Sequence, residues 1–151
     1  MKQGFIEDQE NYPQESYDII MSRLAFHYIE SIDEIFLMIF KALRHNGSFI
    51  FSVEHPVITS HQVSIKQGSN RQDWTVDRYF MTGKRQLKWL GGEVIKYHRT
   101  IEDYFQCLKK AGFIVEELRE SVPQAKNIKD KKLLERRSRV PLYLFLKAKK
   151  H

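Results

Sequence analysis

Short apolar runs alternate with amphipathic stretches along this chain, and the pattern predicts buried strands covered by helices. Residues 17–22 are almost wholly apolar, which is typical of a strand that is buried on both faces. Ser31 is predicted to open a helix, because a glutamate follows three residues later and apolar residues then recur every three or four positions. An Asn-Gly pair is predicted to end this helix, and residues 48–53 form the next buried strand. This order predicts two parallel strands joined by a right-handed crossover.

Residues 56–98 interrupt the alternation. The segment is rich in aromatic and basic side chains, and it is too long to be a simple connection. We therefore interpret it as an insertion. Within it, residues 86–90 and 93–98 are predicted to form the two arms of a hairpin around a glycine pair.

The last third of the chain returns to helices and strands. Thr100 is predicted to begin a helix with Asp103 at its third position, and Gly112 is predicted to end it. Apolar runs at 113–118 and 141–147 predict two further strands, with a basic and partly helical connection between them. Helices that alternate with buried strands indicate the α/β fold class.

Composition adds few constraints. The 151 residues fit one domain, and a hydrophobic content of 42% is enough for a core. No apolar run approaches the ~20 residues that span a bilayer, and no apolar signal region follows the N-terminus, so a soluble cytoplasmic protein is expected. The single Cys107 excludes an internal disulfide and is interpreted as a core or boundary residue. His55 and His61 lack a matching third ligand, so no metal site is predicted.

The net charge is +6, and the positive residues are concentrated late, at 126–132 and 135–139. Acidic residues and leucines interrupt both runs, which favours a solvated helix face or loop. A surface for nucleic acid is the alternative interpretation. Because no nucleic-acid motif accompanies the charge, a nucleic-acid partner is not expected.

Six stretches of the chain, taken in order, resemble a known family. They are residues 13–18 (Pro-Gln-Glu-Ser-Tyr-Asp), 22–28 (Ser-Arg-Leu-Ala-Phe-His-Tyr), 43–47 (Leu-Arg-His-Asn-Gly), 51–56 (Phe-Ser-Val-Glu-His-Pro), 97–100 (Tyr-His-Arg-Thr) and 111–113 (Ala-Gly-Phe). This set resembles the C-terminal half of class I S-adenosylmethionine-dependent methyltransferases, in the group called methyltransferase type 11 or methyltransferase-domain proteins. The resemblance covers nearly the whole chain.

The resemblance implies the C-terminal half of a Rossmann-like sheet. Its strands would lie in the spatial order 4-5-7-6, with the last strand antiparallel and a long aromatic-rich insertion after the second strand. Residues 1–151 would form a single truncated domain that includes the insertion 56–98. S-adenosylmethionine is the implied cofactor. The glycine-rich loop and the acidic residue that grip this cofactor in relatives are not found in the sequence.

The resemblance also implies which residues lie beside the cofactor. An acidic pair before strand 4 usually lies beside the adenine, and Glu7 and Asp8 stand near that position. Residues just after strand 4 face the cofactor in relatives, and here these are Ser22, Arg23, Leu24 and His27. Many relatives have serine in place of Arg23, so this chain departs from the pattern at that contact.

Glu54, His55 and His27 are the predicted catalytic residues. Glu54 and His55 end the second strand, where the methyl acceptor is expected, and His27 stands on the same rim. A histidine that titrates near neutrality suits a general base. In the alternative interpretation, each histidine only holds its loop through a backbone hydrogen bond, and Glu54 orients His55.

The predicted substrate-binding residues are Tyr79, Trp89, Tyr97 and Arg99. The fork of Arg99 matches a carboxylate, so it suits an acidic substrate group. A structural ion pair with Glu54 or Glu102 is the alternative for Arg99. The aromatic residues suit either the wall of a substrate pocket or a small core of the insertion itself.

The predicted function is S-adenosylmethionine-dependent transfer of a methyl group to an unidentified small molecule, impaired by the missing cofactor loop. The alternative is a non-catalytic remnant that forms a homodimer through the exposed edge of the strand at 17–22. A basic nucleic-acid binder that uses residues 126–139 is a third and weaker interpretation.

Overall fold

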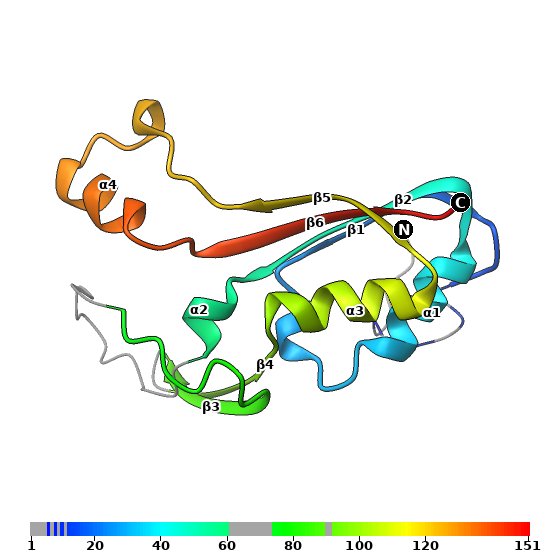
Figure 1. The fold of residues 1–151 in the computed structure, drawn as a ribbon, viewed down its shortest axis with the longest axis horizontal. Coiled ribbons are helices and arrows are strands. Elements are labelled where there is room, and N and C mark those ends of the chain that lie inside the picture. The colour runs from blue at the N-terminus through cyan, green and yellow to red at the C-terminus, as the bar shows by residue number, and fades with distance from the viewer. Residues whose placement is uncertain (1–5, 7, 9, 11, 61–73, 90–91) are drawn as a thin grey trace.

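Four strands form one mixed sheet in the order β1-β2-β6-β5. The computed structural model describes residues 6, 8, 10, 12–60, 74–89 and 92–151, with the backbone alone at positions 88 and 89. The strands are β1 (Tyr17–Arg23), β2 (Leu43–Glu54), β5 (Ile114–Glu120) and β6 (Tyr143–Lys149). β1 and β2 are parallel, whereas β6 runs antiparallel to β2 and β5. The α/β class, the expected order of the four strands and the antiparallel last strand are all found (Figure 1).

Two helices cover one face of this sheet (Figure 1). α1 (Asp33–Ala42) and α3 (Ile101–Ala111) pack against each other, and each contacts a neighbouring strand. The apolar side of each helix meets the side chains that alternate strands point toward it. The largest buried members of this core include Phe36, Ile39, Phe49, Phe51, Leu108 and Leu146. Burial of this apolar surface is the main source of stability.

An aromatic cluster ties the turn after β1 to the core. Phe26 belongs to the 3-10 turn η2 (Phe26–Tyr28), and its side chain is fully buried. Its ring meets the edges or faces of Phe36, Phe49 and Phe51 at centroid distances of 5.2–5.8 Å. Perpendicular aromatic pairs of this kind contribute about 0.5–1.5 kcal/mol each beyond the area that they bury. The turn at the end of β1 is therefore held by packing as well as by its own short helix.

The start of α3 confirms one predicted cap. Oγ1 of Thr100 accepts a hydrogen bond from the backbone N–H of Asp103 (3.0 Å), and Oδ2 of Asp103 accepts one from the N–H of Thr100 (2.7 Å). At the other end, Gly112 adopts the predicted left-handed conformation (φ 102°). A Cβ at Gly112 would also lie only 3.0 Å from the ring of Phe40, so glycine suits both the backbone and the packing there.

The predicted capping box at Ser31 is wrong. The N-cap of α1 is Ile32, one residue later, and no side chain caps the helix. Arg99 gives a physical reason, because its guanidinium donates to the backbone carbonyl oxygens of Ile29 and Glu30 just before the helix. These bonds come from a residue far along the chain. They fix the backbone before α1 so that Ser31 does not occupy the cap position.

The predicted helix end at the Asn-Gly pair is also wrong. α1 ends at Ala42, and β2 begins at the next residue. Asn46 does adopt a left-handed conformation (φ 64°), but it lies inside β2. The register between β1 and β2 shifts between Tyr17 and Ile19, so the Asn-Gly pair marks an irregularity in β2.

Two segments project from this sheet and helix layer. After β2 comes the short helix α2 (Pro56–Thr59), and the predicted hairpin arms pair antiparallel as β3 (Gly83–Trp89) and β4 (Gly92–His98). Between β5 and β6 the chain makes an excursion, residues 121–142, with the 3-10 turn η3 (Ala125–Asn127) and the helix α4 (Lys131–Ser138). In Figure 1 this excursion extends beyond the ends of β5 and β6, away from α1. The predicted partly helical connection is confirmed.

The sheet face opposite α1 and α3 is exposed in the part of the chain that the structure describes. Ile19, Met21 and Phe145 stand on it with 59%, 73% and 42% of their surfaces exposed. β1 lies at one edge of the sheet. An apolar face and an open edge of this kind are typical of interaction surfaces.

We expect Thr100→Ala to lower the free energy of unfolding by about 1 kcal/mol, because α3 loses the oxygen that accepts from its first turn. Ser31→Ala is the matched control, since no side chain caps α1. The control should change stability by less than about 0.5 kcal/mol. Urea unfolding followed by circular dichroism measures both variants. Equal losses would contradict this assignment of the caps.

Candidate functional site

The carboxyl ends of β1, β2 and β5 lie on one rim of the sheet, because these three strands run in the same direction. η2 follows β1, α2 follows β2 and the excursion follows β5. Polar residues from three distant parts of the chain therefore gather on this rim. Open α/β sheets bind their ligands there.

A cavity of about 640 Å³ lies beside the end of β1. Ser22, Arg23 and Leu24 line it together, so the structure brings three of the predicted cofactor residues to one place. Leu24 has a left-handed backbone (φ 53°), which is uncommon for a bulky residue. Its N–H donates to the carbonyl oxygen of Ser52 in β2 (2.9 Å), which holds the strained turn in place. Strain that is held by a neighbouring strand is typical of ligand sites.

His27 lies in η2, and only 1% of its surface is exposed. Its Nδ1 accepts a hydrogen bond from the backbone N–H of Glu54 (3.3 Å), which joins the ends of β1 and β2. Burial lowers the pKa of His27 to about 4, helped by the positive charge of Lys96 and opposed by the carboxylate of Glu54. The imidazole is therefore neutral near pH 7.

Glu54 is held by a lysine that the sequence did not single out. Nζ of Lys96 lies 2.6 and 2.7 Å from the two carboxylate oxygens of Glu54. The two side chains are 12% and 22% exposed, so the pair is largely shielded from solvent. Lys96 belongs to β4 and also lies over the ring of Tyr28, 5.6 Å from its centroid. This pair attaches the hairpin β3–β4 to the rim.

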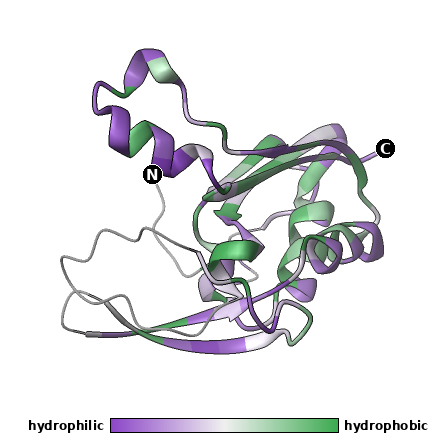
Figure 2. Ribbon diagram, turned by 60° about the vertical axis from the view of Figure 1, so that its left-hand side comes forward, coloured by the Kyte–Doolittle hydropathy of each residue, from purple (hydrophilic) through white to green (hydrophobic). Residues whose placement is uncertain are grey.

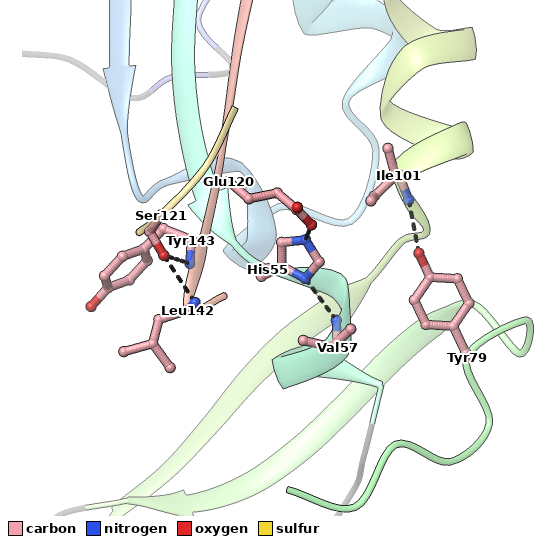
Figure 3. A network of polar contacts seen from close by, with 8 residues as sticks. All are labelled: His55, Val57, Tyr79, Ile101, Glu120, Ser121, Leu142 and Tyr143. Atoms are coloured by element: carbon pink, nitrogen blue, oxygen red, sulfur yellow. Dashed lines mark hydrogen bonds and ion pairs between the residues drawn. The ribbon is translucent and has the colours of Figure 1, made fainter. Parts of the chain in front are cut away.

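His55 caps α2 and binds the end of β5 (Figure 3). Its Nδ1 accepts from the N–H of Val57 (3.2 Å), so Nε2 carries the proton and donates to Oε1 of Glu120 (2.8 Å). Burial lowers the pKa of His55, and the Glu120 carboxylate opposes that shift. Both ring nitrogens of His55 are engaged, which favours the interpretation in which this histidine holds its loop.

Arg99 holds the turn between β1 and α1. Its guanidinium donates to the backbone carbonyl oxygens of Phe26 (3.2 Å), Ile29 (2.8 Å) and Glu30. Arg99 therefore binds backbone carbonyls rather than Glu54 or Glu102, which were its partners in the alternative interpretation. Arg99 also borders a second cavity, of about 280 Å³, together with Tyr97 and His98.

Tyr97 is the other predicted substrate residue that lines this second cavity among the described residues, whereas Tyr79 lies at the start of α3. The hydroxyl of Tyr97 donates to Oε2 of Glu30 (3.3 Å), and both residues line the cavity. The hydroxyl of Tyr79 accepts from the N–H of Ile101 (3.4 Å), which places it at the start of α3 (Figure 3). His98, which is fully buried, bonds Oγ1 of Thr59 and the carbonyl oxygen of Tyr79 (2.8 Å each).

Several predicted residues are not brought into these contacts. Glu7, His61 and the side chain of Trp89 lie outside the described residues, and Asp8 is exposed. Among the described residues, no three His, Cys, Asp or Glu side chains are placed to hold a metal ion.

Solved structures and a family model match this arrangement. Residues 1–51 match the model of the methyltransferase domain family. An S-adenosylmethionine-dependent methyltransferase from Mesorhizobium loti has a TM-score of 0.79 and 34% identity, over 91% of this chain and 63% of that chain. A candidate S-adenosylmethionine-dependent methyltransferase from Listeria monocytogenes has a TM-score of 0.82 and 38% identity, over 93% of this chain and 64% of that chain. Over more than nine tenths of its length, this chain is therefore similar to S-adenosylmethionine-dependent methyltransferases.

S-adenosylmethionine is the cofactor of this methyltransferase family. A curated relative, an uncharacterised protein from Haemophilus influenzae, is 33% identical over 154 residues, which are 96% of this chain and 58% of the relative. This chain thus spans 58% to 64% of the length of these three relatives. Among its described residues, no helix is both long enough and apolar enough to cross a membrane.

Lys96 and Glu120 are rim residues that sequence reasoning missed. Glu120 ends β5, which runs in the same direction as β1 and β2, so its place at a carboxyl end was a usable signal. Lys96 lies in the middle of β4, and no comparable signal marks it.

We expect acid to destabilise this protein through His27. Its pKa is 6.5 when unfolded and about 4 when folded, so between these values the unfolded chain binds a proton that the folded chain does not. Stability is therefore fully present above pH 6.5 and is lost as the pH falls toward 4. From about pH 7 to about pH 5 the loss from this one group is about 2 kcal/mol.

His27→Asn keeps an acceptor near the N–H of Glu54 but cannot titrate, so the variant should lose part of this pH dependence. Urea unfolding across the pH range gives the slope for each protein. His45→Asn is the control, because His45 is exposed. An unchanged slope in the His27 variant would contradict the argument.

Proposed function

We propose that this chain transfers a methyl group from S-adenosylmethionine to a small molecule. The cavity at the end of β1 supports the proposal most directly, because Ser22, Arg23 and Leu24 stand at cofactor positions of the family and line one space of about 640 Å³. Small-molecule sites usually enclose about 300–1,000 Å³. Since the chain spans less than two thirds of its relatives, the activity is our inference from this cavity and from the family.

The residues present fit one side of the cofactor. Arg23 is exposed, and its side chain makes no hydrogen bond or ion pair with any other described residue, so its guanidinium can meet an anionic group of a ligand. Ser22 offers a hydroxyl, and Met21 and Phe145 supply apolar wall. When bound, S-adenosylmethionine supplies a methyl group that its sulfonium already activates. The task of the chain is then chiefly to bind and orient.

The three predicted catalytic residues support orientation better than proton removal. Nδ1 of His27 and Nδ1 of His55 each accept from a backbone N–H, and Lys96 holds both oxygens of Glu54. A group that accepts a proton from the substrate would have to give up its present partner. We infer that these residues keep the acceptor side of the rim in shape.

The exposed face and the open edge of β1 favour a second candidate, a non-catalytic homodimer. If β1 of two copies paired antiparallel around Ile20, Ile19 of one copy would lie opposite Met21 of the other. Both side chains point to the exposed face, where they are 59% and 73% exposed. Such pairing would satisfy the free backbone groups of the edge and cover apolar surface.

We expect S-adenosylmethionine to bind this chain in an isothermal titration, and Ser22→Trp to weaken binding at least about tenfold, which corresponds to ~1.4 kcal/mol. The indole would fill the cavity that Ser22 lines. Ser16→Trp is the matched control, because Ser16 is exposed at the other end of β1 and does not line the cavity. Circular dichroism confirms that both variants fold.

Absence of heat at millimolar S-adenosylmethionine, or equal affinity in the two variants, would remove the proposed function. Light scattering on the same samples separates the second candidate. A stable dimer that binds no S-adenosylmethionine supports the non-catalytic role, whereas a monomer at high concentration counts against it.

A further inference from the structure

The excursion between β5 and β6 carries most of the net charge of the protein. Residues 121–142 hold seven lysine and arginine residues and two acidic residues, a net charge of +5, while the whole chain has +6. In Figure 2 this excursion is coloured mostly as hydrophilic and stands clear of the sheet. A concentrated positive surface attracts anions toward whatever site lies beneath it.

A cavity of about 390 Å³ lies at the base of this excursion. Its walls combine apolar side chains, from Val122, Pro123 and Leu142, with the amides of Gln124 and Asn127. Apolar walls with a few polar groups are the usual lining of a small-molecule site.

Arg137, in the last turn of α4, brings a charge to this cavity. Other arginines are already engaged: Arg85 and Arg99 donate to backbone carbonyls, and Arg44 and Arg119 pair with carboxylates. Arg137 is exposed, and its side chain makes no hydrogen bond or ion pair with any other described residue. A guanidinium in this state is ready to form two parallel hydrogen bonds with a carboxylate or a phosphate.

The walls of this cavity are held by hydrogen bonds. Oγ of Ser121 accepts from the N–H groups of Leu142 and Tyr143 (3.0 Å each), which joins the two ends of the excursion (Figure 3). Oδ1 of Asp130 accepts from the N–H of Lys132 (2.9 Å) and caps the helix that carries Arg137. A site whose walls are already in place spends less free energy on ordering when a ligand binds.

The position of this cavity connects it with the cofactor side of the rim. Tyr143 lines both this cavity and the larger cavity that Ser22 and Leu24 line. A ligand beside Arg137 would therefore lie next to the space proposed for the cofactor.

We propose that the cavity at the base of the excursion binds an anionic small molecule through Arg137, which takes its carboxylate or phosphate. One part of this proposal rests on the proposed function, namely that the anionic molecule is the methyl acceptor. The binding of the anion stands on the cavity, the free guanidinium and the surrounding charge.

Benzoate is a suitable probe, because it combines an apolar ring with a carboxylate, and benzamide is its neutral counterpart. We expect benzoate to bind the full chain more tightly than benzamide in NMR titrations. Arg137→Gln should weaken benzoate about tenfold, as expected for the loss of a charged hydrogen-bond pair. Arg137→Lys keeps the charge but not the forked guanidinium. Its affinity for benzoate should lie between that of the unaltered chain and that of Arg137→Gln.

Lys132→Gln is the matched control, because it removes one charge from the same helix outside the cavity. If the Lys132 and Arg137 variants lost affinity for benzoate equally, the proposal would be overturned in favour of a general positive surface. If both variants also bound an oligonucleotide equally weakly, the ligand of that surface would be nucleic acid. Absence of binding by both benzoate and inorganic phosphate would also overturn it. Benzoate binding without any binding of S-adenosylmethionine would remove the proposed function and leave this site in place.

Discussion

Parallel pairing of β1 with β2 is the constraint on which the rest of this structure depends. Ile20 lies opposite Phe49, and Ser22 lies opposite Phe51. Because the two strands run in the same direction, the turn after β1 and the helix after β2 leave the sheet at the same rim. Phe26 then enters the aromatic cluster within three residues of the end of β1. Core packing and the position of the site are therefore two results of one pairing.

The rim is held by polar contacts that differ in kind from ordinary surface pairs. His27 and His55 accept backbone N–H groups, and burial lowers the pKa of each because it disfavours the charged form. Lys96 and Arg99 reach the rim from β4 and from the residue after it, and they bind a carboxylate and backbone carbonyls. Removal of one partner from such a contact leaves a buried polar group unpaired, which costs about 1–3 kcal/mol. These contacts attach the described part of the insertion to the sheet.

Local signals in the sequence were enough for most of the elements. The strand β1, the start of α3 at Thr100 and the glycine at its end depend only on near neighbours, and each was predicted correctly. The expected burial of β1 on both faces is wrong, because Ile19 and Met21 stand on an exposed face of the sheet. The strand order was accessible because an ordered set of short motifs matched a family. The cofactor role of the three residues at the end of β1 stays a prediction, which their place in one cavity supports.

The errors and omissions depend on contacts between distant residues. Ser31 fails as a cap because Arg99, from far along the chain, holds the carbonyls before α1. Lys96 meets Glu54 across 42 residues, and Glu120 meets His55 across 65. The periodicity of a strand shows which face a side chain occupies but not which distant group it will meet. Such partners need the path of the whole chain.

The pairing of β1 with β2 can be measured directly. Cross-strand nuclear Overhauser contacts in an isotope-labelled sample report which residues of the two strands lie opposite each other. The account predicts that Ile19 contacts Ser48 and that Met21 contacts Ile50, in parallel order. Contacts in the reverse order, with Ile19 near Ile50 and Met21 near Ser48, or no contact between the two segments, would contradict it.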